Sequence, residues 1–338
     1  MRICIVGAGA IGGVLGARLA LGGENVTFIA RGENLEAIKA RGMRLRHSDG
    51  REEIARDVSA TDSFEGAGRF DVVILTLKAH QVGEVAARIE SLCDAETVVM
   101  PLQNGVPFWY FQGHGGAFDG RAVEAVDPGG KIRDAIPARR IIGGVVFVAA
   151  ERIGPGEVMH TGNDRLPLGE LDGRATARIA RLSGAFARAG FQAPVVDDIR
   201  AEVWIKLWGN VTFNPISALT HAGVSDICTD VDGRDLAARM MQEAQAVGEK
   251  LGITFRITID QRLEGATRVG RHRTSMLQDV EAGRALEIDA LVGSVVELGA
   301  LVDVPTPTIR AIHQAAKLLD RTMRAGNLSV RAAPLAAR

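Results

Sequence analysis

Three polar side chains suited to catalysis recur at every fourth position of an otherwise apolar stretch. Lys206, Asn210 and Asn214 stand in the segment IRAEVWIKLWGNVTFNPISALT, residues 199–220. In a helix, residues four apart lie on one face, so the three would form a single polar stripe. A helix that is apolar on its other sides is expected to be buried, and a buried lysine is retained only with a partner or a use. The stripe is therefore a candidate wall of an active site.

The sequence offers two possible ion-pair partners for Lys206. Glu202 precedes it by four residues, the favourable order for a surface ion pair, which contributes roughly a few tenths of a kcal/mol. The other candidate is Glu287, which falls in ALEIDALVG, a mainly apolar segment that predicts a helix. If Glu287 faces Lys206, each charge explains the other.

The N-terminus carries a dinucleotide-binding signature. A short apolar strand at residues 2–6 is followed by G-x-G-x-x-G, and then by a helix at 11–21 and a strand at 25–30. In this context the first glycine permits the tight turn, the second lets pyrophosphate approach the backbone, and the third allows close helix packing. The predicted cofactor-binding turn consists of Gly7, Ala8, Gly9, Ala10, Ile11 and Gly12. The alternative is an ordinary glycine-rich turn.

The end of the second strand favours NADP over NAD. NAD-binding folds carry an acidic residue there for the ribose hydroxyls. This strand ends in Arg31, whose guanidinium can pair with a 2′-phosphate. Glu33, the nearest acid, lies past the turn, where it more naturally starts the next helix.

Two further polar residues follow buried strands, at the edge where open α/β sheets bind ligands. Lys78 comes after FDVVIL at residues 70–75, and Asn104 comes after the strand at 97–100. Lys78 is thus placed to contact a bound ligand, and the carboxamide of Asn104 could face a nicotinamide or a substrate oxygen. Lys78 could equally open a solvent-exposed helix, and Asn104 precedes a glycine in a pair typical of turns.

The rest of the chain gives its domain organisation. Phe108–Phe111, FWYF, begins a glycine-rich segment that either caps a pocket or is a surface insertion held down by its aromatics. Residues 157–160 and 165–168 predict an antiparallel hairpin. Strand signals stop after Asp197, so we expect an NADP-binding Rossmann-like domain at 1–197, a helical catalytic domain at 198–325, and a frayed tail at 326–338.

Composition narrows the function classes. The 338 residues carry a net charge of -1, with no block of like charge, so neither nucleic acid nor an anionic membrane is the expected partner. Three scattered cysteines predict no disulfide framework, no metal site, and a cytoplasmic location. No uninterrupted apolar run reaches the length of about 18 residues that a membrane-spanning helix needs.

Together these motifs resemble the ketopantoate reductase (2-dehydropantoate 2-reductase) family. GAGAIGG, FIARG, LKAHQ, QNGV, IRAEVWIKLWGNVTFNP and TSMLQD…EID occur in the family's order over residues 1 to about 320. The resemblance implies a Rossmann-like N-terminal domain and a C-terminal helical domain like that of 6-phosphogluconate dehydrogenase, with the active site in the cleft between them. The segment between QNGV and Ile141 is longer here than in the family's pantothenate-pathway members, which leaves the identity of the 2-oxo acid open.

The resemblance also implies individual roles. Lys206 matches the catalytic proton donor, and Glu287 matches the acid that hydrogen-bonds lysine and substrate. Ser275 matches a substrate-binding serine, although S-x-x-Q also predicts a capping box with Ser275 as helix N-cap. Asn210 and Asn214 match the family's substrate-binding asparagines. Lys78 and Asn104 match residues on the nicotinamide side, and Asn104 is also expected at the substrate. The NADP site is matched by Gly7, Gly9, Gly12 and Arg31.

The predicted activity is an oxidoreductase reaction in pantothenate biosynthesis, the NADPH-dependent reduction of ketopantoate to pantoate. One alternative is a reductase of a different, bulkier 2-oxo acid on the same fold. Another is an NADP-sensing protein without catalysis, which would have no need for the lysine, asparagine, serine and glutamate together. The apolar C-terminal helices leave room for a homodimer.

Overall fold

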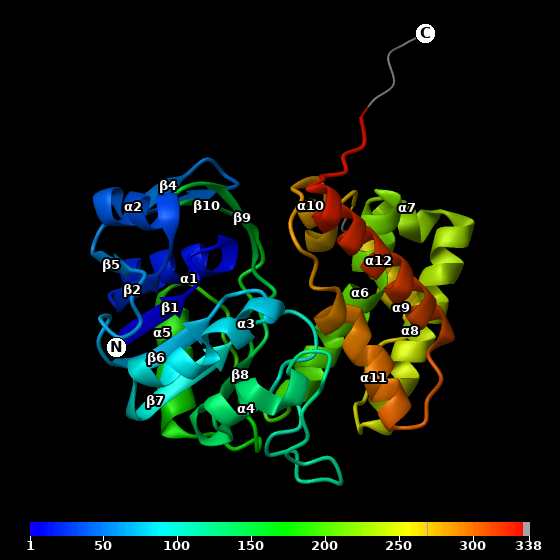
Figure 1. Cartoon of the computed structure of the whole chain (residues 1–338), viewed down its shortest axis with the longest axis horizontal. Coiled ribbons are helices and arrows are strands. Elements are labelled where there is room, and N and C mark those ends of the chain that lie inside the picture. The colour runs from blue at the N-terminus through cyan, green and yellow to red at the C-terminus, as the bar shows by residue number, and fades with distance from the viewer. Residues whose placement is uncertain (269, 334–338) are drawn as a thin grey trace. The chain divides into compact units, whose positions relative to one another are not determined.

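The computed structural model describes residues 1–268 and 270–333, which form two compact units (Figure 1). The first comprises Met1–Ala122 and Asp127–Glu202, and the second comprises Val123–Val126 and the chain from Val203 onward. All strands found in the described residues belong to the first unit, and the second is helical. The predicted fold class, a Rossmann-like α/β domain with an all-α C-terminal domain, is confirmed.

A five-stranded parallel sheet forms the centre of the first unit, in the order β5-β2-β1-β6-β7. From β1 the chain passes through α1 to β2, which pairs with one edge of β1, and β6 later pairs with the other edge of β1. Such a reversal of strand order creates a crevice at the carboxyl ends of the strands. The strands are β1 (Arg2–Val6), β2 (Asn25–Ile29), β5 (Val58–Thr61), β6 (Phe70–Leu75) and β7 (Cys93–Pro101).

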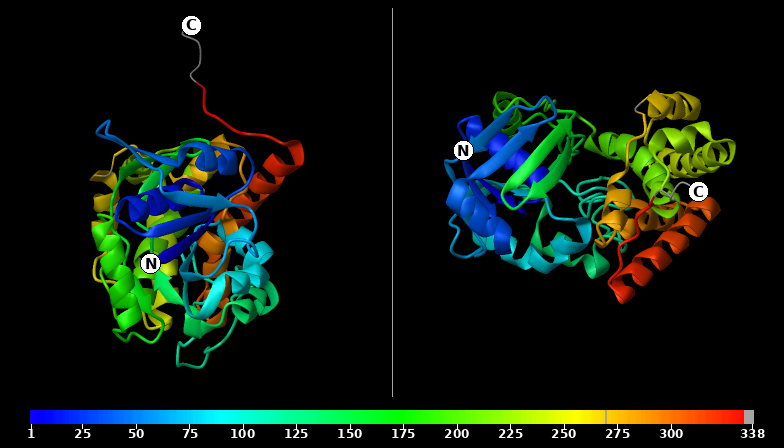
Figure 2. Two further views of the ribbon diagram at one scale, coloured as in Figure 1. Left: turned by 90° about the vertical axis from the view of Figure 1, so that its left-hand side faces the viewer. Right: turned by 90° about the horizontal axis from the view of Figure 1, so that it is seen from above.

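A second, mixed sheet covers α1 (Ala10–Leu21) from the other side, in the order β4-β3-β10-β9. Glycines let α1 approach both sheets. A Cβ at Gly13 would lie 2.5 Å from Val158 Cγ1, and one at Gly16 would lie 2.3 Å from Phe28 Cζ. The strands, visible side by side in the right-hand view of Figure 2, are β3 (Met43–His47), β4 (Glu52–Ala55), β9 (Ala149–Gly154) and β10 (Glu157–Gly162).

The predicted hairpin between residues 157–160 and 165–168 is wrong. β10 pairs antiparallel with β9 across a tight turn at Pro155 and Gly156, while β11 (Leu168–Glu170) pairs with β8 (Ile142–Gly144). Asp164, in the supposed hairpin turn, is instead held by Arg18 of α1. That contact holds the segment around Asp164 against α1. Residues 157–160 and 165–168 therefore belong to different sheets.

The remaining helices of the first unit flank its sheets. They are α2 (Gly32–Arg41), α3 (Ala79–Val85), α4 (Lys131–Ala135) and α5 (Ala177–Arg188), with short 3₁₀ turns at Ala86–Leu92, Pro128–Gly130 and Ala138–Arg140.

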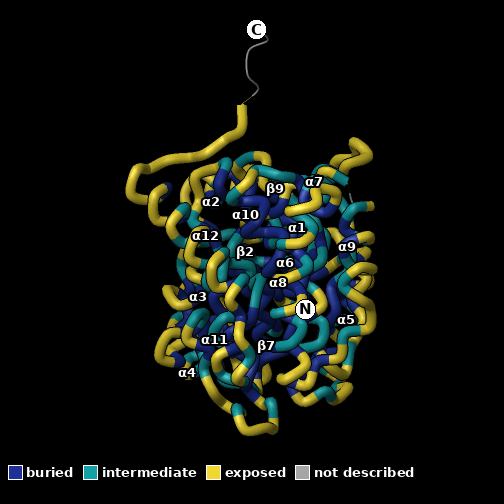
Figure 3. The backbone as a smooth tube through the Cα atoms, turned by 90° about the vertical axis from the view of Figure 1, so that its right-hand side faces the viewer, coloured by how far each residue is buried: buried dark blue, intermediate teal, exposed yellow. Residues whose placement is uncertain are grey.

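The second unit is built around α6 (Ile199–Thr220), whose first turn belongs to the first unit. Most of α6 is buried, as its dark tube in Figure 3 shows. The other helices are α7 (Val224–Thr229), α8 (Val231–Lys250), α9 (Ile259–Arg268), α10 (Ser275–Glu281), a π-helical turn at Asp289–Gly293, α11 (Ser294–Leu301) and α12 (Pro307–Gly326).

From residue 327 to residue 333 the chain has neither helix nor strand (Figure 2). The N–H of Leu328 donates to the carbonyl of Met323, and that of Val330 donates to the carbonyl of Val280. Residues 334–338 of the predicted frayed tail lie outside the described residues. No helix within 1–268 and 270–333 is both long and apolar enough to cross a membrane.

Candidate active site

The turn after β1 has the backbone geometry of a phosphate-binding loop. Gly7 adopts φ +105°, and a Cβ at Gly12 would lie 2.0 Å from the Gly7 carbonyl oxygen. At Gly9, by contrast, a Cβ would meet no heavy atom within 4 Å. α1 begins at Ala10 and has no acidic residue in its first turn, so its N-terminal N–H groups and dipole favour an anion. The turn therefore fits the pyrophosphate of a dinucleotide.

Two side chains that sequence reasoning missed hold this turn in place. Thr76, directly after β6, donates its hydroxyl to the Gly7 carbonyl at 2.6 Å. Asn34 of α2 donates to the Ala8 carbonyl at 2.7 Å and accepts from the Gly156 N–H at 2.7 Å. Thr76 had a signal, because it follows a buried strand as Lys78 does. Asn34 had none, since its two partners come from distant parts of the chain.

Arg31 lies where the sequence places a 2′-phosphate ligand. It follows β2, precedes the first residue of α2, and is exposed. No hydrogen bond or ion pair joins its guanidinium to another residue within the described ranges. Glu33 lies in the first turn of α2, where its charge favours the helix dipole. The guanidinium is thus available to an anionic ligand.

Lys78 and Asn104 lie at the same edge of the parallel sheet as the glycine turn, because β1, β6 and β7 are parallel and end there. Both side chains are half-buried. Lys78 precedes α3, and Asn104 precedes Gly105, which adopts φ +88°. Between them, Gln103 donates to the Leu75 carbonyl at 2.9 Å and ties the ends of β6 and β7 together.

The FWYF segment is core of the first unit. All four side chains of Phe108–Phe111 are buried, with Trp109, Tyr110 and Phe111 at 0% exposure. A Cβ at Gly143 would lie 2.9 Å from the Trp109 ring. Arg200, in the first turn of α6, donates to the carbonyls of Tyr110 and Gln112, each at 2.7 Å. These contacts support the interpretation as an insertion held down by its aromatics.

In the helical unit, Lys206 is half-buried on α6. Burial lowers the pKa of Lys206 to about 8, and the nearby carboxylate of Glu287 acts in the opposite direction. Glu202 forms a bidentate pair with Arg165, at 2.8 and 2.7 Å. Since Glu202 is engaged by Arg165, the surface-pair interpretation of Lys206 loses its support.

The asparagines of the stripe differ in burial, and one of them meets Ser275. Asn210 is half-buried, whereas Asn214 is 5% exposed and its amide lies 3.5 Å from the Ser275 hydroxyl. The predicted N-cap role of Ser275 is wrong. Thr274 is the N-cap of α10, and its hydroxyl accepts from the Leu277 N–H at 3.2 Å. Because the Thr274 hydroxyl caps the N-terminus of α10, the exposed Ser275 hydroxyl is not needed for capping.

Glu287 lies just before a helix and not inside one, contrary to the sequence prediction. Its carbonyl accepts from the Leu291 N–H at 3.1 Å, and a π-helical turn follows. Asp289, two residues on, accepts from His313 at 2.9 Å and from Lys317 at 3.0 Å. These bonds fix the start of the helix to α12, so Glu287 extends from an anchored backbone.

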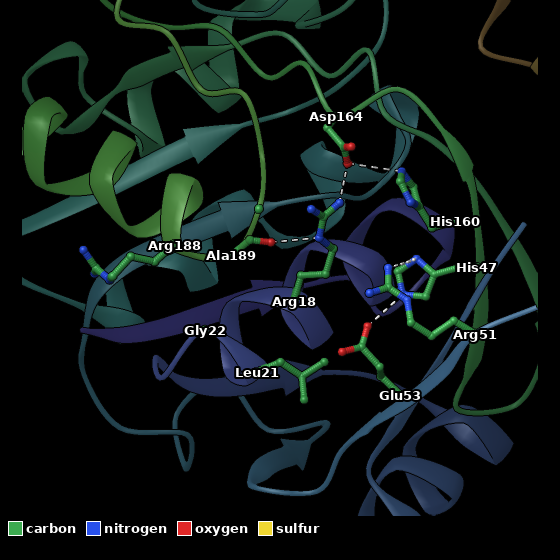
Figure 4. A pocket seen from close by; sticks show the side chains of 11 residues that line it. Arg18, Leu21, Gly22, His47, Arg51, Glu53, His160, Asp164, Arg188 and Ala189 are labelled. Carbon is green, nitrogen blue, oxygen red and sulfur yellow. Dashed lines mark hydrogen bonds and ion pairs between the residues drawn. The ribbon is translucent and has the colours of Figure 1, made fainter. Parts of the chain in front are cut away.

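A pocket of about 370 Å³ elsewhere on the first unit does not involve these residues (Figure 4). Its charged side chains mostly pair with one another or with neighbours. His47 bonds Glu53 at 2.8 Å, His160 lies 3.4 Å from Asp164, and Arg18 donates to the Ala189 carbonyl at 2.8 Å. The pair of His47 and Glu53 joins β3 to β4, and the contacts of Arg18 join α1 to Asp164 after β10 and to the end of α5.

Comparison with known proteins agrees with this architecture. The model described as "Ketopantoate reductase PanE/ApbA" matches residues 3–118 and 119–173, and its C-terminal counterpart matches residues 198–320. The chain belongs to the ketopantoate reductase family. The reductase class, an oxidoreductase acting on CH–OH groups, is thereby confirmed.

Individual members of this ketopantoate reductase family match nearly the whole chain. A 2-dehydropantoate 2-reductase of Mesorhizobium japonicum is 51% identical over 92% of this chain and 95% of its own length. A crystal structure from Ralstonia solanacearum MolK2, provisionally described as a ketopantoate reductase, is 42% identical with TM-score 0.90, covering 95% of this chain and 98% of that one. The 2-dehydropantoate 2-reductase of Geobacter metallireducens is 31% identical with TM-score 0.82, covering 95% and 100%.

Proposed function

We propose that this protein reduces 2-dehydropantoate (ketopantoate) to pantoate with NADPH, a step of pantothenate biosynthesis. The observation that carries the proposal is the group around Lys206. In a member of this family, a half-buried lysine whose pKa is lowered to about 8 lies near the carboxylate of Glu287, on the same face as Asn210 and Asn214. A proton donor of this pKa is well matched to work near neutral pH.

In the proposed reaction, the bound cofactor would provide the hydride for the carbonyl carbon of the 2-oxo acid. Lys206 donates its proton to the carbonyl oxygen as negative charge develops there. The ammonium also stabilises that charge electrostatically, which is often the larger contribution. Glu287 favours the protonated form of Lys206 and orients it, while burial works against that form.

The cofactor would be held by the first unit. The backbone of the Gly7–Gly12 turn and the start of α1 would bind the pyrophosphate. Arg31, exposed and available, would bind the 2′-phosphate that distinguishes NADP from NAD. Lys78 and Asn104, at the same sheet edge, would line the nicotinamide side, and Asn104 would also approach the substrate.

The substrate would be held by neutral groups of the second unit. Asn210, Asn214 and Ser275 offer donors and acceptors that orient a 2-oxo acid without adding charge. The proximity of Asn214 to Ser275 supports their acting on one part of the substrate.

The test is oxidation of NADPH by the purified full-length protein, followed by the absorbance of reduced nicotinamide, against a panel of 2-oxo acids that includes ketopantoate. We expect ketopantoate to give the highest kcat/KM. A bulkier acid as the best substrate would overturn the substrate assignment, and no oxidation by any acid, despite tight NADPH binding, would overturn catalysis.

A further inference from the structure

Arg262 of α9 lies against the helix that carries the proposed proton donor. A Cβ added at Gly209 of α6 would lie 2.3 Å from Arg262 Nη2, so the guanidinium fills the space above that glycine. The guanidinium carbon is also 6.0 Å from the centre of the Phe213 ring. The cation therefore rests on one turn of α6, between Gly209 and Phe213.

Arg262 is half-buried, and no carbonyl or carboxylate within residues 1–268 and 270–333 accepts from its guanidinium. Other inward-pointing arginines behave differently. Arg200 donates to three carbonyls and Arg140 pairs with Glu90. Burial lowers the pKa of Arg262, and the nearby Cys228 side chain acts in the opposite direction. Withdrawing such a group from water is unfavourable unless an acceptor is provided.

Helix geometry places this cation beside the polar stripe. On a helix, residues four apart form parallel ridges, so the row of Ile205, Gly209 and Phe213 runs next to the row of Lys206, Asn210 and Asn214. Arg262 lies over the first row at the level of Asn210. It thus flanks the stripe on the side of residue 209.

We propose that Arg262 binds the carboxylate of the 2-oxo acid substrate. The inference rests on the proposed function, in which Lys206 donates its proton to the carbonyl oxygen. The side chains proposed to hold the substrate are neutral: Asn104, Asn210, Asn214 and Ser275. A carboxylate is the planar anion that matches the guanidinium fork with two parallel hydrogen bonds. Arg262 makes the enzyme selective for 2-oxo acids over uncharged 2-oxo compounds of the same shape.

The experiment compares a 2-oxo acid with its own neutral amide as substrates of the wild type and of Arg262→Gln. The acid is the one that the wild type reduces fastest. We expect Arg262→Gln to raise KM for the acid about 10- to 100-fold, the effect of losing a hydrogen bond to a charged group, with kcat changed much less. KM for the amide should stay the same, and Arg262→Lys should recover part of the loss on the acid.

Two further variants separate binding from structure. Gly209→Ala introduces a Cβ where the guanidinium rests and should reproduce the acid-specific loss without removing the charge. Arg268→Gln changes an exposed arginine of the same helix that pairs with Glu264, and should alter neither substrate. Equal losses on acid and amide in Arg262→Gln, with a lower Tm, would show a structural role and overturn the proposal.

Calorimetric binding of ketopantoate to the protein loaded with NADP⁺ keeps this test independent of turnover. If the wild type reduces no acid, the proposed function fails. Weaker ketopantoate binding by Arg262→Gln than by wild type would still support the carboxylate site. Equal binding, or no binding by either protein, would overturn it.

Discussion

In the Gly7–Gly12 turn, the features that suit phosphate come from residues within a single strand–turn–helix segment. In the group around Lys206, each feature comes from a different part of the chain: the lysine from α6, the carboxylate of Glu287 from before α11, and the hydroxyl of Ser275 from α10. The first candidate site depends on backbone conformation. The second is made by side chains that tertiary packing brings together, so its chemistry depends on burial and on neighbouring charges.

Substitutions in the two regions should therefore have different effects. Changes in the turn should affect cofactor binding, because backbone N–H groups bind but do not react. Changes in the Lys206 group should affect turnover and its pH dependence.

The largest expected effect is that of Lys206→Met. Loss of the proton donor should lower kcat about 10²–10⁴-fold, while the Kd for NADPH stays the same. Steady-state kinetics and cofactor titration measure the two. Lys250→Met, at the exposed end of α8, is the matched control. A variant at residue 206 with near-normal kcat on its best substrate would remove the lysine from the mechanism.

The counterpart in the turn is Gly9→Ala. The added Cβ meets no protein atom within 4 Å, so the Tm should not fall, but it enters the space proposed for pyrophosphate. We expect NADPH binding to weaken about 10- to 100-fold, as for loss of hydrogen bonds to a charged group. Gly184→Ala in α5, which also has room for a Cβ, controls for the extra methyl group. Unchanged binding would mean that phosphate does not approach Gly9.

Arg31→Ala tests the cofactor choice within the first unit. Loss of a guanidinium–phosphate pair should weaken NADPH binding about 10- to 100-fold and leave NADH binding nearly unaffected. Fluorescence titration with both nucleotides measures the ratio. Lys39→Ala removes an exposed cation of α2 and should change the binding of neither nucleotide. Equal losses for the two nucleotides would contradict the 2′-phosphate assignment.

The pH profile tests the electrostatics of the stripe. Lys206 must be protonated to donate, so kcat/KM should fall as pH rises through the lysine's pKa of about 8. Glu287 favours the protonated lysine, so Glu287→Gln should lower that pKa and move the fall in kcat/KM to a lower pH. Measurement of kcat/KM from about pH 6 to 10 in wild type and Glu287→Gln decides this, with the exposed Glu249→Gln as control. If the fall in kcat/KM stays at the same pH or moves to a higher pH in Glu287→Gln, Glu287 does not raise the pKa of Lys206.

The smallest effect is expected from Glu202→Gln, which distinguishes the two partners first considered for Lys206. Glu202 is engaged with Arg165, so the variant should lose about 1 kcal/mol of stability or less. Its kcat and pH profile should match those of the wild type. Urea denaturation and the same pH series provide the measurements. If the fall in kcat/KM moved to a lower pH in Glu202→Gln, Glu202 would again be a partner of Lys206.

The sequence alone determined the features that depend on local spacing. The alternation of strands and helices predicted the parallel sheet, and the glycine spacing predicted a turn in which Gly7 adopts positive φ and Gly12 excludes a side chain. Period-four spacing put Lys206, Asn210 and Asn214 on one face of α6. Helix period, strand period and glycine conformation are properties of neighbouring residues, so they can be derived without knowing the fold.

Tertiary structure decided which residues meet. Glu202 pairs with Arg165, and Glu287 lies close enough to Lys206 to raise the pKa of that lysine. Thr274, and not Ser275, is the N-cap of α10. Tertiary structure also replaced the predicted hairpin after β10 with strands in two different sheets. These outcomes depend on contacts between segments far apart in the chain, and on the burial that sets a pKa. Arg262, which no sequence motif marked, became a candidate substrate ligand only because packing placed it over Gly209 without an acceptor among the described residues.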